Sequence, residues 1–126
     1  MDPQTISVIA ATAVGFLSPY LAKAGEAAAK KVGEGIYRTL KDRFGSKPAA
    51  QEALTDLEKA PDDADHQAAL RVQLKKVLAE DKEFASDLQR LLREAGETEA
   101  GATIIQQTAG DNAKQFGQVF GDITFG

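Results

Sequence analysis

The chain has no cysteine, no tryptophan and a single histidine, His66, among its 126 residues. Without cysteine it has neither a disulfide framework nor a thiolate metal site, so a reducing cytoplasm is its expected location at rest. One histidine cannot build a zinc site alone, and we therefore expect no metal and no cofactor. His66 follows the polar run 61–65. We interpret it as an exposed residue that opens a helix.

Patterns that mark catalysis or nucleic-acid binding are also missing. The chain contains no Gly-x-x-x-x-Gly-Lys phosphate loop, and its serines have no histidine close by in sequence to act as a base. Its carboxylates fall on expected helix surfaces, where charges are usually solvated. The net charge is −4, and the recognition motifs of the common nucleic-acid-binding folds are absent. We expect neither an enzyme nor a nucleic-acid-binding protein.

Charge is missing from residues 3–22, which include a nearly continuous apolar run at 6–17. This is not a secretory signal, because Met1-Asp2-Pro3 provides no positive region. Asp2 and Pro3 suit a helix start. Ser18-Pro19 resembles a second cap and start, so the first helix is expected to end near Leu17.

The apolar run is a marginal membrane span. About 15 helical residues cover about 22 Å, whereas the hydrocarbon core is about 30 Å thick. A helix that continued through Pro19 would just reach across. The alternative is an ordinary buried core helix, which does not exclude later insertion. The candidate membrane-active residues are Ile6, Val8, Ile9, Val14, Phe16 and Leu17.

A second helix is expected from Pro19 to about Phe44. Its apolar stripe follows one step of seven and then steps of four, and comprises Leu21, Ala28, Val32, Ile36, Leu40 and Phe44. Glycines within it either allow close helix contact or mark a helix that rearranges; these are Gly25, Gly33 and Gly35. Residues 22–48 carry seven basic and three acidic side chains. The candidate contacts to anionic lipid are Lys23, Lys30, Lys31 and Arg38.

Three further amphipathic helices are expected at 48–60, 63–79 and 81–95. Their predicted inward residues are Ala50, Ala53, Leu54 and Leu57, then Leu70, Leu74, Val77 and Leu78, then Phe84, Leu88, Leu91 and Leu92. The run Pro61-Asp62-Asp63 is expected to cap the second of these helices, and Asp81 suits the N-cap position of the third. Residues 1–96 are therefore predicted to form an all-α domain, a small bundle of four to five helices.

The character of the chain changes after the polar linker 97–101. Glycines recur through 102–126, and aromatic and β-branched residues fill the gaps, which favours strands over helix. One interpretation is a small hairpin docked on the helices, or a disordered end. The other is intermolecular cross-β stacking, in which glutamines form ladders and phenylalanines stack about 4.8 Å apart.

Residues 112–123 resemble the bacterial amyloid signalling sequences related to the RHIM motif of animal necroptosis proteins. The matching core is Lys114-Gln115-Phe116-Gly117, where Lys114 stands in place of the usual β-branched residue. The resemblance implies a homotypic fibril as the assembled state. The residues of this amyloid motif are Asn112, Gln115, Phe116, Gly117, Gln118, Val119, Phe120, Gly121, Asp122 and Ile123.

The body of the chain resembles the small helical Bell domains of bacteria, which are analogues of the fungal HeLo and animal executioner four-helix domains. The resemblance rests on Met1-Asp2-Pro3 before an apolar helix, a basic second helix rich in alanine and glycine, and amphipathic helices ending near Ala95. It implies an executioner of cell death in a prokaryotic NLR-like immune system, which disrupts membranes when clustered.

The same resemblance implies the partners. They are copies of the chain itself, an NLR-like STAND receptor with a matching N-terminal motif, and membrane lipid after activation, when the protein moves from cytoplasm to cell membrane. The alternative is a non-toxic amyloid adaptor whose helical body recruits another effector. The apolar run at 6–17 favours the executioner, because an adaptor needs no such segment.

Overall fold

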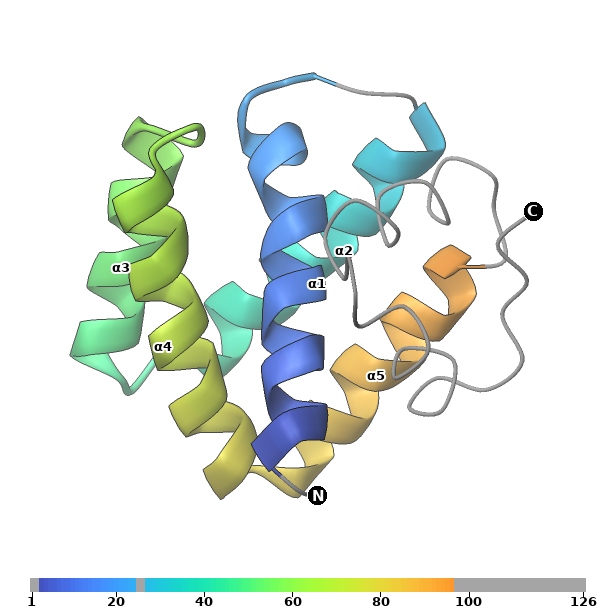
Figure 1. Ribbon diagram of the computed structural model, residues 1–126, viewed down its shortest axis with the longest axis vertical. Helices are drawn as coiled ribbons and strands as arrows, with labels where there is room; N and C mark the ends of the chain where they lie inside the picture. Colours follow the sequence, from blue (N-terminus) through green and yellow to red (C-terminus); the bar gives the residue numbers. More distant parts are fainter. Residues whose placement is uncertain (1–2, 25–26, 97–126) are drawn as a thin grey trace.

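In the computed structural model, residues 3–24 and 27–96 are described, and they form five helices (Figure 1). These are α1 (Pro3–Leu21), α2 (Ala27–Arg43), α3 (Pro48–Lys59), α4 (Ala64–Glu80) and α5 (Lys82–Gly96). The predicted small all-α bundle is confirmed. The predicted linker at 97–101 and the predicted cross-β segment at 102–126 lie outside the described residues.

The helix α1 lies at the centre of the bundle. It packs against α2 and α5 on one side and against α4 on the other, with a smaller contact to α3 (Figure 1). A helix that is apolar all round is typically a buried one, and α1 carries no charged residue. Its buried residues are Ile6, Val8, Ile9, Ala10, Thr12, Ala13, Val14, Phe16, Leu17 and Ser18.

The outer helices are amphipathic and turn one face to this core. All the predicted inward residues of α3 and α4 are buried, as are Phe84, Leu88 and Leu92 of α5, while Leu91 is half-buried. In α2, Ile36 and Leu40 are fully buried, and Phe44 just beyond it meets Phe84 edge to face with ring centroids 6.4 Å apart. The 3.6-residue period therefore located the core faces of these helices correctly.

Side-chain caps begin two of the outer helices at the predicted residues. The Asp63 carboxylate accepts hydrogen bonds from the backbone N–H groups of Asp65 (2.8 Å) and His66 (3.1 Å). Asp81 accepts one from the N–H of Phe84 (3.0 Å) at the start of α5. The bonds from His66 and Asp65 lower the pKa of the Asp63 carboxyl, because they stabilise its ionised form. His66 lies in the first turn of α4, as predicted, but is half-buried rather than exposed.

The predicted break at Ser18-Pro19 is wrong, because α1 continues through both residues to Leu21. Proline deprives the helix of one hydrogen bond, the one that would reach the Gly15 carbonyl. That loss falls close to the helix end, where few turns remain to be disturbed. Ending the helix at Leu17 would instead remove Tyr20 and Leu21 from the core that they pack against. Tertiary packing therefore outweighs the local signal.

The helix ends two residues later in a Schellman motif. The N–H of Lys23 bonds to the Tyr20 carbonyl at 3.1 Å, and the N–H of Ala24 bonds to the Pro19 carbonyl at 2.9 Å. Lys23 has a φ of 58°, the left-handed conformation that glycine usually supplies at this position. The first helix consequently ends at Leu21, and the second begins at Ala27 instead of Pro19.

Candidate functional site

The candidate membrane-active residues all lie in the core of the resting bundle. Ile9 and Leu17 are fully buried, and the most exposed of the set, Ile6, is only 8% exposed. Among the described residues, α1 is the one helix long and apolar enough to span a membrane. Its 19 residues cover about 28 Å, close to the hydrocarbon thickness. The core helix of a soluble protein meets the same criteria, so the way in which α1 is held matters more than its composition.

Apolar packing holds the central part of α1 in place. Within residues 6–17 of the described structure, the one side-chain hydrogen bond runs from the Thr12 hydroxyl to the Val8 carbonyl at 2.7 Å. Both groups belong to α1 itself. The buried hydroxyl is therefore satisfied wherever the helix goes, and no side-chain hydrogen bond to another helix has to be broken in this segment.

The outer helices, in contrast, are joined by polar side chains. Arg43 at the end of α2 donates to Asp87 of α5 at 3.1 Å and lies 3.5 Å from Asp81, the residue that caps α5. Lys47, just before α3, pairs with Glu80 of α4 at 3.3 Å. These contacts connect α2 to α5, and the segment before α3 to α4, without passing through α1.

Another polar contact joins α2 to α3 through Tyr37, which donates its hydroxyl hydrogen to Glu58. This bond and burial raise the pKa of the Tyr37 hydroxyl. The neighbouring hydroxyl in turn raises the pKa of Lys41, whose ammonium lies 5.1 Å from the centre of the Tyr37 ring. The same ring meets Tyr20 of α1 at a centroid distance of 5.8 Å, an aromatic contact without a hydrogen bond.

The approach of α1 to α2 is set by Gly33. A Cβ built at this position would lie 2.4 Å from the Tyr20 Cβ and 2.9 Å from the Phe16 carbonyl oxygen, so no larger residue fits without a shift. At Gly35 a Cβ would meet only Leu91, at an ordinary 3.9 Å. The sequence suggested either close helix contact or a helix that rearranges at these glycines. Close contact is confirmed for Gly33, and Gly25 lies outside the described residues.

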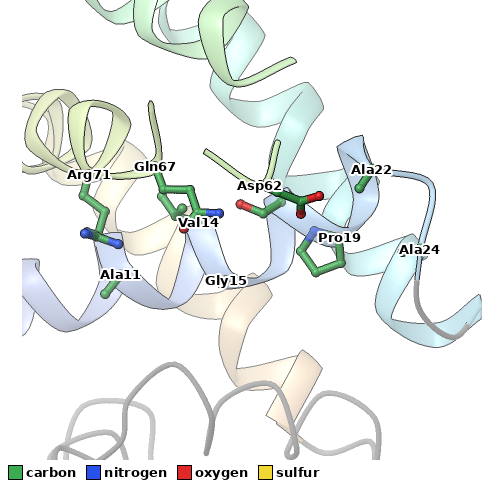
Figure 2. Close-up of a pocket in the computed structure, with 10 residues that line it drawn as sticks. Ala11, Val14, Gly15, Pro19, Ala22, Ala24, Asp62, Gln67 and Arg71 are labelled. Carbon is green, nitrogen blue, oxygen red and sulfur yellow. The ribbon is translucent and has the colours of Figure 1, made fainter. Parts of the chain in front are cut away.

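A groove of about 490 Å³ lies between α1 and α4, beside their packing contact. Its α1 wall bears small residues, and its other wall bears polar side chains, with Arg71 near Ala11 at one end and Asp62 near Pro19 at the other (Figure 2). Ser18 also lines the groove, and its buried hydroxyl makes no hydrogen bond. Sequence reasoning overlooked this wall, although small residues four apart at Ala11 and Gly15 were a usable signal.

The four candidate lipid-contacting residues are all exposed. Lys30, Lys31 and Arg38 share one side of α2 because they stand seven or eight positions apart. Arg38 forms an ion pair with Glu34 at 2.5 Å, which offsets part of the positive charge. Lys23 is separate from them, in the turn that ends α1.

The ten amyloid-motif residues, 112 and 115–123, lie outside the described residues. Within the part of the chain that the structure covers, no group of three or more His, Cys, Asp or Glu side chains is placed to hold a metal ion.

Comparison with known proteins gives a family match. The model of the Het-E N-terminal domain family matches residues 1–124 of this chain, which include all five helices and most of the C-terminal segment. No curated protein and no solved structure matches the chain.

Proposed function

Because the chain belongs to the Het-E N-terminal domain family, a HeLo-like family of cell-death domains, we propose that it is a cell-death executioner that disrupts membranes. The bundle is its resting state, and α1 acts by leaving the bundle and entering the membrane. The observation that carries this proposal is the way α1 is held. It lies at the centre of the bundle, yet across residues 6–17 its one side-chain hydrogen bond is to its own backbone.

The transfer of α1 from protein core to lipid costs its apolar side chains little. Lipid tails are about as apolar as the leucines that surround α1 in the bundle, so Ile9 and Leu17 keep a comparable environment. The backbone hydrogen bonds of a helix are internal and travel with it, as does the bond from Thr12 to Val8. The main cost of leaving falls on the outer helices, whose apolar faces lose their partner.

The polar contacts of the outer helices fit this division. Arg43 with Asp87, and Tyr37 with Glu58, continue to join α2 to α5 and α3 after α1 has gone. The outer helices, still joined by these contacts, then close over the faces that α1 had filled. The exposed side chains of Lys30 and Lys31 add attraction to anionic lipid, about 1 kcal/mol for each cation close to the surface.

The trigger in this proposal is the C-terminal segment. An NLR-like STAND receptor presents a cross-β template, and residues 112–123 add to it through backbone hydrogen bonds along its exposed edge. Tethering on the fibril raises the local concentration of bundles to about millimolar.

The substitution Ala11→Asp tests the membrane step. Ala11 lines the groove near Arg71 (Figure 2), so a carboxylate there faces a cation in the resting bundle. Near the middle of a membrane span the same charge costs about 2.5 to 3.5 kcal/mol, roughly 100-fold in insertion. Cell killing and dye release from vesicles are expected to fall accordingly. Val72→Asp is the matched control, because it adds the same charge at an exposed site on α4 and should leave both activities unchanged.

The trigger is tested separately. A peptide of residues 100–126 is expected to form thioflavin-positive fibrils, and a chain that stops after residue 101 should fold but not kill. A peptide that stays monomeric at high concentration removes the amyloid step. Killing that survives Ala11→Asp, while depending on the C-terminal segment, would favour the adaptor, whose helical body need not enter a membrane.

A further inference from the structure

The α1 wall of the groove contains four small residues, with Val14 and Pro19 beside them. Ala11, Gly15, Ser18 and Ala22 all line the groove. Steps of four, three and four place them along one face of α1, with Ala22 directly after its last residue. Figure 2 shows Ala11, Gly15 and Ala22 along this wall, with Gln67 and Arg71 of α4 across the groove. We refer to these four residues as the small-residue strip. The opposite face of α1 carries Phe16 and Tyr20, which contact α2 at Gly33.

On the small-residue strip, one side-chain hydroxyl has no hydrogen-bond partner and one backbone carbonyl lacks the N–H that a helix usually supplies to it. Ser18 is 9% exposed, and its hydroxyl makes no hydrogen bond. Three residues earlier, the Gly15 carbonyl faces Pro19, which has no N–H to donate to it. The strip therefore presents one hydrogen-bond donor and one acceptor side by side.

The Ser18 hydroxyl is already buried without a partner in the resting bundle. In lipid, each polar group left unsatisfied costs several kcal/mol. Membrane helices with an interior proline are tolerated because a neighbouring helix or a serine or threonine side chain satisfies the freed carbonyl. Small residues allow the backbones to come close enough for such a bond.

We propose that in the membrane α1 of one copy packs against α1 of a second copy along the small-residue strip, with the Ser18 hydroxyl of each donating to the Gly15 carbonyl of the other. This inference rests on the proposed insertion of α1. A second copy is the fitting partner because the strip is self-complementary, as a two-fold interface requires. Donor and acceptor lie on the same face of the same helix. In a symmetric pair, each Ser18 hydroxyl therefore bonds to the Gly15 carbonyl of the other copy, and two equivalent hydrogen bonds form.

Because the chain has no cysteine, disulfide crosslinking between single introduced cysteines can test the pairing. Single cysteines are placed on the strip at Ala11, Gly15 and Ala22, and on the opposite face at Ile9 and Ala13, in the full-length chain. Each variant is activated on vesicles of phosphatidylethanolamine and phosphatidylglycerol and then oxidised. The yield of disulfide dimer is expected to be about tenfold higher at the strip positions than on the opposite face. A tenfold preference is about what one interhelical polar contact contributes. Ala13→Cys is matched to Ala11→Cys because both replace alanine.

Lipids that carry a photoreactive acyl chain, used in the same samples, report whether α1 has inserted. If α1 is not labelled, insertion fails, and the pairing fails with it. If α1 is labelled but the cysteines crosslink equally on both faces, or not at all, the pairing alone is wrong and the proposed function stands.

The substitution Ser18→Ala distinguishes the hydroxyl from the shape of the strip. It should leave the resting bundle folded, since Ser18 makes no hydrogen bond there, and it should reduce the dimer yield of Ala22→Cys severalfold on vesicles. Gly15→Leu, with room in the groove at rest, should abolish that dimer by keeping the backbones apart. An unchanged dimer yield in both variants overturns the proposal.

Discussion

The helix α1 and the outer helices α2 and α5 share one core but are held in it by different interactions. Across residues 6–17, α1 contributes apolar side chains and one hydroxyl bonded to its own backbone. The outer helices add Arg43, Asp81 and Asp87 to their apolar faces, and these polar side chains connect α2 to α5. Apolar packing is preserved when lipid replaces protein, whereas directional polar contacts keep particular helices together. The bundle therefore contains one helix suited to leave and a set suited to remain associated.

The largest expected effect comes from removing a core side chain of the central helix. Phe16 is 1% exposed, and Phe16→Ala should lower the free energy of unfolding by about 3 to 5 kcal/mol, because it loses transfer free energy and leaves a cavity. Urea denaturation followed by circular dichroism measures this. A loss below about 1 kcal/mol would mean that α1 is not the centre of the resting bundle.

A smaller effect is expected where α1 meets α2. Gly33→Ala forces a Cβ against Tyr20 and the Phe16 carbonyl, an overpacking that costs about 1 to 3 kcal/mol and outweighs the gain in helix propensity. Gly35→Ala makes the same propensity gain of up to about 1 kcal/mol without the collision, so its urea midpoint should rise. Equal midpoints for the two variants would contradict the close approach of α1 and α2.

Acid should weaken an outer helix while sparing the contacts of α1, which has no titratable carboxylate. The pKa of Asp63 is lowered in the folded state. Its stabilising contribution is therefore present above the pKa of the unfolded chain, near pH 4, and is lost as the pH falls through the lowered value. Asp63→Ala should lower the urea midpoint at pH 7. Below pH 4, the urea midpoint of this variant should fall less steeply with pH than that of the parent. An Asp63→Ala midpoint that matches the parent at pH 7 would show that the cap contributes nothing.

The smallest effect is expected from the polar contact between α2 and α5. Arg43 is partly exposed, so Arg43→Gln should cost less than about 1 kcal/mol, and 1 M salt should reduce the difference further. Lys75→Gln, at an exposed position on α4, is the control. A cost above 3 kcal/mol would indicate that polar contacts, and not the packing around α1, dominate the resting bundle.

Much of the fold could be predicted from the sequence because the outer helices are amphipathic. Leu70, Leu74 and Val77 recur with a helical period, and Asp63 and Asp81 stand where caps are needed, so the bounds and the buried faces of α3, α4 and α5 followed. The end of α1 could not be predicted. Ser18-Pro19 is a sound start signal, but the fit of Tyr20 against Gly33 is a tertiary contact that no local pattern contains.

The candidate site was predictable in composition and not in arrangement. An uncharged apolar run identified Ile6, Phe16 and Leu17 as residues of interest, and it left open whether they are buried at rest; the structure buries them. The partners of Arg43 lie 38 and 44 positions away in the chain, and a single sequence gives no means of pairing them. The orphan hydroxyl of Ser18 depends on which helices surround it, and so it required the fold.

The central claim is that α1 leaves the bundle for the membrane while the outer helices stay together. Photo-crosslinking from lipid acyl chains tests it on the unaltered chain, activated on vesicles of phosphatidylethanolamine and phosphatidylglycerol and mapped by mass spectrometry. The account predicts labels within Pro3–Leu21 and none on the residues of α3, α4 and α5 that are buried in the resting state. Labels spread over the buried faces of all five helices, or absent from α1, would contradict it.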